Sequence, residues 1–287
     1  MITQCASVVL RFHHGASLRL LQDALCSLAT QTYQSIELVV AGQNLDALEL
    51  TEIQSLCDTY LKPRKIRVQL HNLKMKKGVD GRARLLSLGI QASQGQYLSF
   101  LDYDDILYPD AIQYLIGELK KNPNCVLAAG LCMRADLQVK NRKAVYIKSK
   151  EPFLPHKDSI LDLYVDNFLP IHSFVINKKV CKPADLKIDE KFLVREDYYL
   201  LLNLSVKYPF CLTSKKIATC EYRFRDDQTN TTPVWKNKKD KRIQIWLKNS
   251  ILLENFKKTL HLKMSLSELS KGLIQSMQVW AKEGEKS

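Results

Sequence analysis

The 287-residue sequence contains no uninterrupted apolar run approaching the roughly 20 residues of a membrane-spanning helix. Residues 1–10 lack the basic start and the cleavage-site pattern of a secretory signal peptide, so we expect a cytoplasmic protein. Internal repeats and low-complexity tracts are also absent, and 46% of the residues are hydrophobic, which excludes wholesale disorder. A chain of this length buries a full core without needing a metal or a disulfide to fold.

Paired cysteines are missing as well. The eight cysteines are scattered, and none belongs to a C-x-x-C pair of the kind that marks many zinc sites. Several lie inside apolar stretches, such as residues 125–132. We therefore expect buried free thiols in a reducing compartment rather than a disulfide framework.

Basic residues outnumber acidic ones by 43 to 30, which gives a net charge of +13. Such an excess favours a polyanionic partner: nucleic acid, anionic lipid or a phosphorylated substrate. Residues 235–287 alone hold 12 Lys and Arg against 5 Asp and Glu, and they also contain all three tryptophans (Trp235, Trp246 and Trp280). The basicity is thus partly a property of the C-terminal tail.

Short apolar segments alternate with segments of helical periodicity in the first half of the chain. This alternation predicts a parallel sheet covered by helices, an α/β architecture in which ligands bind beyond the carboxyl ends of the strands. The expected strands are residues 7–10, 36–40, 66–70 and 97–101, and the expected helices are residues 18–28, 48–61 and 82–92.

The second half of the chain is less regular. We expect a helix from Pro109 to Lys121, with the proline in its first turn, and a buried strand over residues 125–133. Residues 138–167 are basic and irregular, which is typical of an excursion over an active site. Residues 198–206 are strongly apolar and predict a buried helix.

The composition shifts after Pro233, and residues 234–287 predict a basic, amphipathic helical appendage. One helix would carry an apolar stripe, and a second would open at the capping box Ser265–Glu268. Two interpretations remain open: peripheral contact with the inner face of a membrane, or packing onto the protein or onto a second subunit. We expect no nucleic-acid binding, because no motif of that kind is present.

The sharpest local signal is the acidic group Asp102, Asp104 and Asp105, which directly follows a predicted buried strand. Three carboxylates this close repel one another unless a cation lies among them, and a divalent ion shared with a substrate's phosphates is one solution. The alternative is an acidic turn that caps the helix beginning near Pro109. Spacing alone does not decide between the two.

Four groups of motifs resemble family 2 glycosyltransferases. These are inverting enzymes with the GT-A fold, a Rossmann-like domain, and they use nucleotide-diphospho-sugar donors. The resemblance covers roughly residues 5–230 in the family's order, with its core signature at residues 81–110. It implies a GT-A domain over 1–233, divided into a nucleotide-sugar-binding half (1–110) and an acceptor-binding half (111–233). The other matching segments are 7–14, 25–33 and 36–40 in the first βαβ unit, then 194–200 and 221–225.

The resemblance also implies roles for single residues. Asp102 and Asp104 would be the D-x-D pair that binds Mn²⁺ or Mg²⁺, with Asp104 the main ligand and Asp102 nearer the donor's ribose or sugar. Asp197 would be the general base for the acceptor hydroxyl, and Glu196 would orient the acceptor or the base. Without the upstream motifs, Glu196 and Asp197 would read as ordinary carboxylates at a helix N-terminus.

Three departures from the family pattern change the expected donor site. Residues 41–44 replace an Asp-Asp pair that reads the nucleotide base, so Gln43 or Asn44 would have to substitute. Residues 86–89 replace the family's Arg-Asn-x-Gly sequence, which leaves Arg82 or Arg84 as the diphosphate partner. Arg225 stands where a metal-binding His is common; a guanidinium grips phosphate but binds no metal, so we expect a weaker metal requirement.

Three further side chains complete the expected site. Phe12 and His13 follow the first strand, at the mouth where the donor nucleotide should lie. His172 borders the acceptor pocket in the family pattern, with a buried, hydrogen-bonded histidine as the alternative.

The resemblance therefore implies an inverting transfer of a sugar from a nucleotide-diphosphate donor to a glycan or glycolipid acceptor. Synthesis of a surface polysaccharide, a lipopolysaccharide or a lipid-linked glycan is the expected setting. The alternative is a non-catalytic GT-A-like binding or scaffolding module, favoured by the altered nucleotide pocket.

Overall fold

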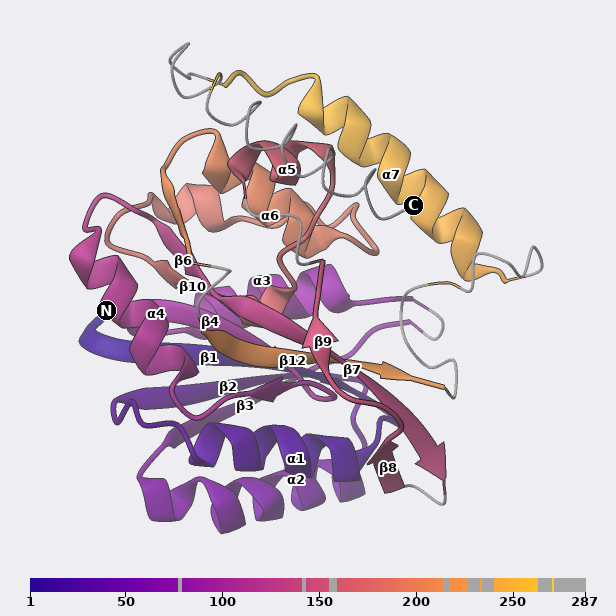
Figure 1. Ribbon diagram of the computed structural model, residues 1–287. Coiled ribbons are helices and arrows are strands. Elements are labelled where there is room, and N and C mark those ends of the chain that lie inside the picture. Colours follow the sequence, from indigo (N-terminus) through magenta and orange to yellow (C-terminus); the bar gives the residue numbers. More distant parts are fainter. Residues whose placement is uncertain are drawn as a thin grey trace.

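The architecture is a layered α/β fold around a main sheet (Figure 1). The computed structural model describes residues 1–76, 79–140, 143–154, 159–213, 217–226, 233, 240–262 and 270, with the side chains of residues 139, 140, 143 and 144 left aside. Within these residues the main sheet has seven strands, in the order β11 (Phe210–Leu212), β6 (Leu127–Ala129), β10 (Phe174–Asn177), β4 (Gly95–Asp102), β1 (Ile2–His13), β2 (Ile36–Gln43) and β3 (Arg67–Leu73).

The strands β4, β1, β2 and β3 run parallel, with β3 at the edge of the sheet, while β10 is antiparallel to both of its neighbours. The inner parallel strands β4, β1 and β2 are buried on both faces, and this explains why their segments read as apolar runs, whereas the partly buried β3 alternates. The expected α/β architecture with a parallel-rich sheet is confirmed.

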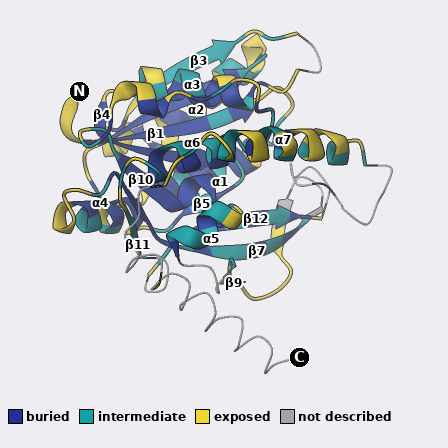
Figure 2. Cartoon of the chain, turned by 90° about the horizontal axis from the view of Figure 1, so that it is seen from above, coloured by how far each residue is buried: buried dark blue, intermediate teal, exposed yellow. Residues whose placement is uncertain are grey.

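Helices cover both faces of the sheet (Figure 1). The helices α1 (Leu18–Ala29), α2 (Ala47–Tyr60) and α4 (Ala111–Lys121) share one hydrophobic cluster, and α3 (Arg82–Ala92), α6 (Glu196–Ser205) and α7 (Arg242–Lys257) share the other. Ser17 caps α1, accepting from the backbone N–H of Leu20. Figure 2 shows the sheet as the most deeply buried layer between these helices.

A second sheet flanks the first, in the order β5 (Ile106–Leu107), β12 (Ala218–Arg225), β7 (Leu131–Lys140) and β8 (Lys143–Tyr146). The two-residue strand β9 (Glu151–Pro152) also pairs with β7. The region expected to be irregular, residues 138–167, therefore contributes strands, and it also forms the short helix α5 (Ile160–Val165). The 3₁₀ turns η1 (Lys62–Arg64), η2 (Ile171–Ser173) and η3 (Pro183–Leu186) complete the described elements.

Two expected boundaries were wrong. The single strand over residues 125–133 is divided at Gly130, with β6 in the main sheet and β7 in the second. A Cβ atom at Gly130 would meet the Thr219 side chain at 2.4 Å, so the chain crosses between the sheets where only glycine fits. The helix expected from Pro109 begins at Ala111, because the Pro109 carbonyl accepts from Thr32 instead of opening the helix.

The described part of the tail packs onto the rest of the protein. Leu253 of α7 is buried, and the ring of Phe256 lies 4.5 Å from that of Tyr199 on α6. Asn249, also buried, accepts from the backbone N–H of Leu193. The second expected tail helix, from Ser265 onward, lies outside the described residues, and the boundary at residue 233 stays a prediction.

All eight cysteines are free thiols, and five of them are buried, as expected. Among the described helices, none has both the length and the apolar character needed to cross a bilayer.

Candidate active site

The carboxyl ends of β1 and β4 bring a cation and a carboxylate together. Arg11 lies opposite Asp102 in the parallel register, and its Nε and Nη2 each donate to a different Asp102 oxygen at 2.8 Å. The third nitrogen of the same guanidinium donates to Glu196 at the start of α6. Arg11 thus joins residues separated by 94 positions in the sequence into one ion-paired group, and sequence reasoning had assigned it no role.

A cavity of about 760 Å³ opens at this edge of the sheet, and we call it the first cavity. It lies beyond the ends of β1, β2 and β4, the position at which α/β sheets bind ligands. Six residues expected to bind donor or metal line it: Phe12, His13, Arg82, Asp102, Asp104 and Arg225. Tyr103, unassigned before, packs edge-on against both Phe12 and His13.

Arg84 is not brought to this cavity. Its side chain is exposed and donates to Glu190 at 2.8 Å, whereas Arg82 lines the cavity from the first turn of α3. Successive helical residues point about 100° apart, so Arg84, two positions after Arg82, points to nearly the opposite side of α3. Of the two expected diphosphate partners, only Arg82 is placed to act.

Asp104 is bound by the arginine that replaces the common histidine. Arg225 Nη1 lies 2.5 Å from Asp104 Oδ2, and the guanidinium lies over the ring of Tyr103, 5.8 Å from its centroid. Burial raises the pKa of Asp104 above its ordinary value, and the Arg225 charge acts in the opposite direction.

This donor set does not fit a divalent ion at the D-x-D pair. Both Asp102 oxygens already accept from Arg11, and Asp104 carries the Arg225 guanidinium, which would repel a second cation. Within the described residues, two groups of three or more His, Cys, Asp or Glu side chains come close enough to share an ion, and neither includes Asp102 or Asp104. The expected metal site at these residues therefore lacks support from the geometry.

Gln43 and Asn44 hold a loop beside the first cavity. Gln43 donates to the Val79 carbonyl at 2.8 Å and accepts from Gly81 N–H at 3.0 Å. Asn44, in the left-handed region at φ +56°, accepts from Met75 N–H at 2.7 Å. The two amides that replace the family's acidic pair are thus engaged in shaping the cavity wall.

A second cavity of about 430 Å³ adjoins the first and shares five lining residues with it: Arg11, Arg82, Asp102, Asp105 and Tyr222. It is lined by Glu196, Asp197 and an aromatic group (Phe153, Tyr222, Phe224 and Trp246). The residue preceding α6, Arg195, is left-handed at φ +65°, and its guanidinium donates to Asp166 and to Ser250 of α7. Backbone in this region costs free energy for a non-glycine residue and is often found at functional sites.

Asp197 faces the second cavity with the properties of a base. One carboxylate oxygen accepts from Tyr198 N–H at 2.7 Å, and the other accepts from the Asn167 side chain at 3.2 Å. Burial, reinforced by the neighbouring Glu196 charge, raises the pKa of Asp197 to about 6 against the opposing effect of Arg11. A carboxylate poised near neutral pH is suited to proton transfer.

His172 and Asp105 lie in the wall of the second cavity. Asp105 is buried, accepts from the backbone N–H of Arg223 at 2.8 Å, and lies 3.2 Å from His172 Nδ1. The His172 side chain is buried and lies beside Cys132 and Asp105, and the residue also borders the second cavity. Both alternatives for His172 are thus partly met. The third aspartate of the acidic motif is therefore a wall residue.

Comparison with known proteins identifies the family of this chain. A model described as glycosyl transferase family 2 matches residues 7–181. An uncharacterized glycosyltransferase of Rickettsia typhi is 24% identical over 205 residues, covering 68% of this chain and 56% of that protein. One of Haemophilus influenzae is 23% identical over 219 residues, covering 74% and 63%. The chain thus spans less than two thirds of the length of these relatives.

Solved structures agree in fold. S. aureus TarS 1–349 in complex with UDP-GlcNAc has a TM-score of 0.55 at 15% identity, covering 77% of this chain and 59% of that one. Mannosyltransferase PcManGT from Pyrobaculum calidifontis, in complex with GDP-Man and Mn²⁺, has a TM-score of 0.53 at 12% identity, covering 76% and 56%. The fold is that of GT-A glycosyltransferases, and with a family model matching more than half of its length the chain belongs to glycosyl transferase family 2.

Proposed function

We propose that the protein transfers a sugar from a nucleoside-diphosphate donor in the first cavity to an acceptor hydroxyl in the second, with inversion at the anomeric carbon. The observation that carries this is the placement of Asp197, a carboxylate with a raised pKa, in a cavity that shares five wall residues with its neighbour. A base on the acceptor side of a shared wall can remove the hydroxyl proton while that oxygen attacks a sugar held on the donor side.

The donor diphosphate is proposed to lie against Arg82 and Arg225. Both line the first cavity, and guanidinium groups bind phosphate oxygens in a bidentate manner. Binding would draw Arg225 from Asp104 toward the phosphates and stabilise the charge that develops on the leaving diphosphate. No Mn²⁺ or Mg²⁺ is needed for this step, and we propose that metal dependence is weak.

The acceptor is proposed to be a glycan or glycolipid. The aromatic faces that line the second cavity suit sugar rings, whose C–H faces pack on them while the hydroxyls reach polar groups at the rim. Synthesis of a surface polysaccharide or a lipid-linked glycan in the cytoplasm would supply such an acceptor. This last step rests on family likeness.

The test is Asp197→Asn, assayed for sugar transfer with a panel of nucleotide sugars and glycan acceptors. Loss of the base should lower turnover by at least about 10²-fold while donor binding and thermal stability stay near wild type. The exposed Arg84→Gln is the matched control and should leave turnover unchanged.

Turnover by Asp197→Asn at the wild-type rate would remove the assigned base. Donor binding without turnover by the wild-type protein with any acceptor would favour the alternative, a non-catalytic binding module.

A further inference from the structure

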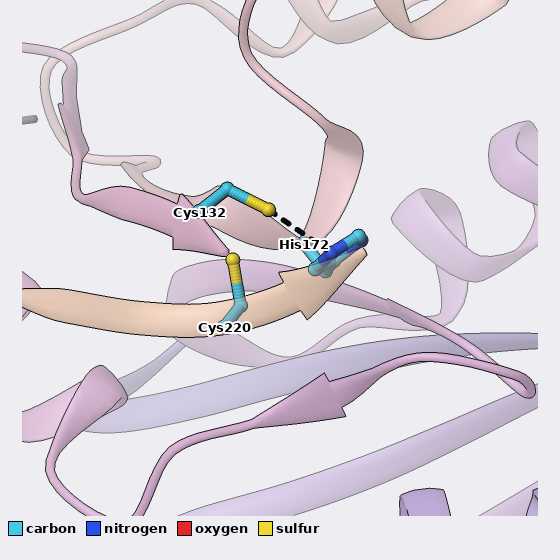
Figure 3. A group of neighbouring side chains, drawn as sticks. All are labelled: Cys132, His172 and Cys220. Carbon is cyan, nitrogen blue, oxygen red and sulfur yellow. Dashed lines mark hydrogen bonds between the residues drawn. The ribbon is translucent and has the colours of Figure 1, made fainter. Parts of the chain in front are cut away.

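Two thiols and an imidazole meet in the wall behind the second cavity, and the proposed reaction uses none of them. Cys132 on β7 and Cys220 on β12 are register partners in the parallel pair of strands, and His172 comes from η2. Their exposed fractions are 4%, 0% and 1%. Figure 3 shows the three side chains as neighbours, with the Cys132 sulfur facing His172 and the Cys220 sulfur rising from β12 toward Cys132.

The separations are those of a metal-ligand set. Cys132 Sγ lies 3.8 Å from His172 Nε2, and one ligand atom from each of the three residues lies within 4.8 Å of the others. A tetrahedral zinc ion, with bonds of about 2.3 Å to sulfur and about 2.0 Å to nitrogen, holds those two atoms about 3.6 Å apart. Only small side-chain movements would bring the three atoms onto one ion.

A carboxylate lies beside the other ring nitrogen of the imidazole. His172 Nδ1 is 3.2 Å from Asp105 Oδ2, an ion-pair separation without hydrogen-bond geometry, and the other Asp105 oxygen accepts from Arg223 N–H at 2.8 Å. A histidine that binds zinc commonly donates its second ring nitrogen to a carboxylate, which fixes the ring orientation. Asp105 is the carboxylate placed to take that role when Nε2 binds the ion.

We propose that Cys132, Cys220 and His172 bind one zinc ion, with a water molecule as the fourth ligand. Two thiolates and an imidazole select zinc over the oxygen-preferring Mn²⁺ and Mg²⁺. The ion joins β7, β12 and η2 behind the second cavity and stabilises that wall. The site is independent of the proposed function and of the D-x-D pair.

The test is the zinc content of the untagged, full-length protein, purified under reducing conditions without chelators and measured by elemental mass spectrometry. We expect about one zinc per chain, falling below about one tenth in Cys132→Ser and in Cys220→Ser. Cys57→Ser removes an equally buried thiol outside the group and should retain the metal. Zinc retained by both Cys132→Ser and Cys220→Ser would overturn the proposal, because the metal would lie elsewhere.

A second measurement stands even if those variants fail to fold. Cobalt(II) exchanged into the wild-type protein should give the thiolate charge-transfer and strong visible bands of a tetrahedral sulfur-ligated ion. Wild-type protein that contains no zinc and gives no such spectrum overturns the proposal. A wild-type chain whose mass is lower by two hydrogens also overturns the proposal, if the disulfide that this loss indicates joins Cys132 and Cys220.

Discussion

At the scale of single residues, Arg11 connects the two cavities of the site. Its guanidinium is largely buried and shared between Asp102 and Glu196. Glu196 in turn precedes Asp197, whose pKa Arg11 lowers and Glu196 raises. The protonation of the proposed base is therefore set by residues from both halves of the fold.

The pH dependence of transfer should report this arrangement. Asp197 must be ionised to accept a proton, and its pKa is about 6, so kcat/KM should fall about tenfold per pH unit below that value and level off above it. In Arg11→Gln the lowering charge is gone, so the acidic limb should move to higher pH. The measurement is a pH profile of kcat/KM, with Arg84→Gln as control.

A wild-type profile that stays flat from pH 7 down to pH 4 would contradict the role of Asp197. Arg11→Gln should also lose about 3–5 kcal/mol of stability, since it leaves the buried Glu196 and the partly buried Asp102 without their cation. The profile of this variant is therefore measured at low temperature. An unshifted limb in folded protein would show that Arg11 does not tune the base.

At the scale of elements, Gly130 is where the chain passes from one sheet to the other. The backbone N–H of Gly130 donates to the Ser173 carbonyl at 2.9 Å, and Thr219 of β12 packs against its Cα. This contact sets β7 and β12 side by side and so positions the wall that carries Tyr222 and Arg225.

Gly130→Ala should destabilise the fold by about 1–3 kcal/mol, because the added methyl group overlaps Thr219. Thr219→Ala removes the two nearest clashing atoms, so the double variant should recover part of that loss. Denaturant unfolding of the wild type, both single variants and the double variant measures the coupling. Strictly additive effects would contradict the proposed contact.

Helix α7 offers a matched pair of apolar residues on opposite faces. Leu253 is 1% exposed and Ile251 is 64% exposed, and Figure 2 shows the buried and exposed sides of the helix. Leu253→Ala should cost about 2–5 kcal/mol of unfolding free energy, whereas Ile251→Ala should change it by less than about 0.5 kcal/mol. Equal effects in thermal or denaturant unfolding would show that α7 does not dock as described.

The pattern of the sequence predicted the elements better than the contacts between them. The alternation of apolar segments located β1 to β4 and α1 to α3, because burial on a parallel sheet leaves a local signature. It joined β6 and β7 into one strand, since an apolar run does not show which sheet each half enters. The acidic spacing after a buried strand singled out Asp102 and Asp104, and family likeness assigned their roles and that of Asp197.

Long-range partners left no such local signature. The tie between Arg11 and Glu196 spans 185 residues, and the group of Cys132, His172 and Cys220 has no short ligand spacing. Arg225 and Asp104, which form an ion pair, are 121 residues apart in the sequence. The pair was not predicted: the sequence showed only that Arg225 stands where a histidine is common in the family. These contacts join elements that are distant in the sequence, and periodicity does not encode such pairings.

At the scale of the whole molecule, two adjoining cavities meet over the carboxyl ends of the central strands. Arg225 and Asp104 line only the first, Asp197 lines only the second, and Arg11, Arg82 and Asp102 line both. This division matches the two substrates of a glycosyltransferase. The central claim is that the first cavity binds a nucleoside diphosphate through arginines.

The most direct measurement is thermal unfolding with UDP, GDP, dTDP and CDP, each with and without Mn²⁺. One nucleotide at about 100 times its dissociation constant should stabilise the protein by about 2.7 kcal/mol without metal, and Arg225→Gln should abolish that gain. Stabilisation that appears only with Mn²⁺ would contradict the arginine clamp, and no stabilisation by any nucleotide would contradict the donor site itself.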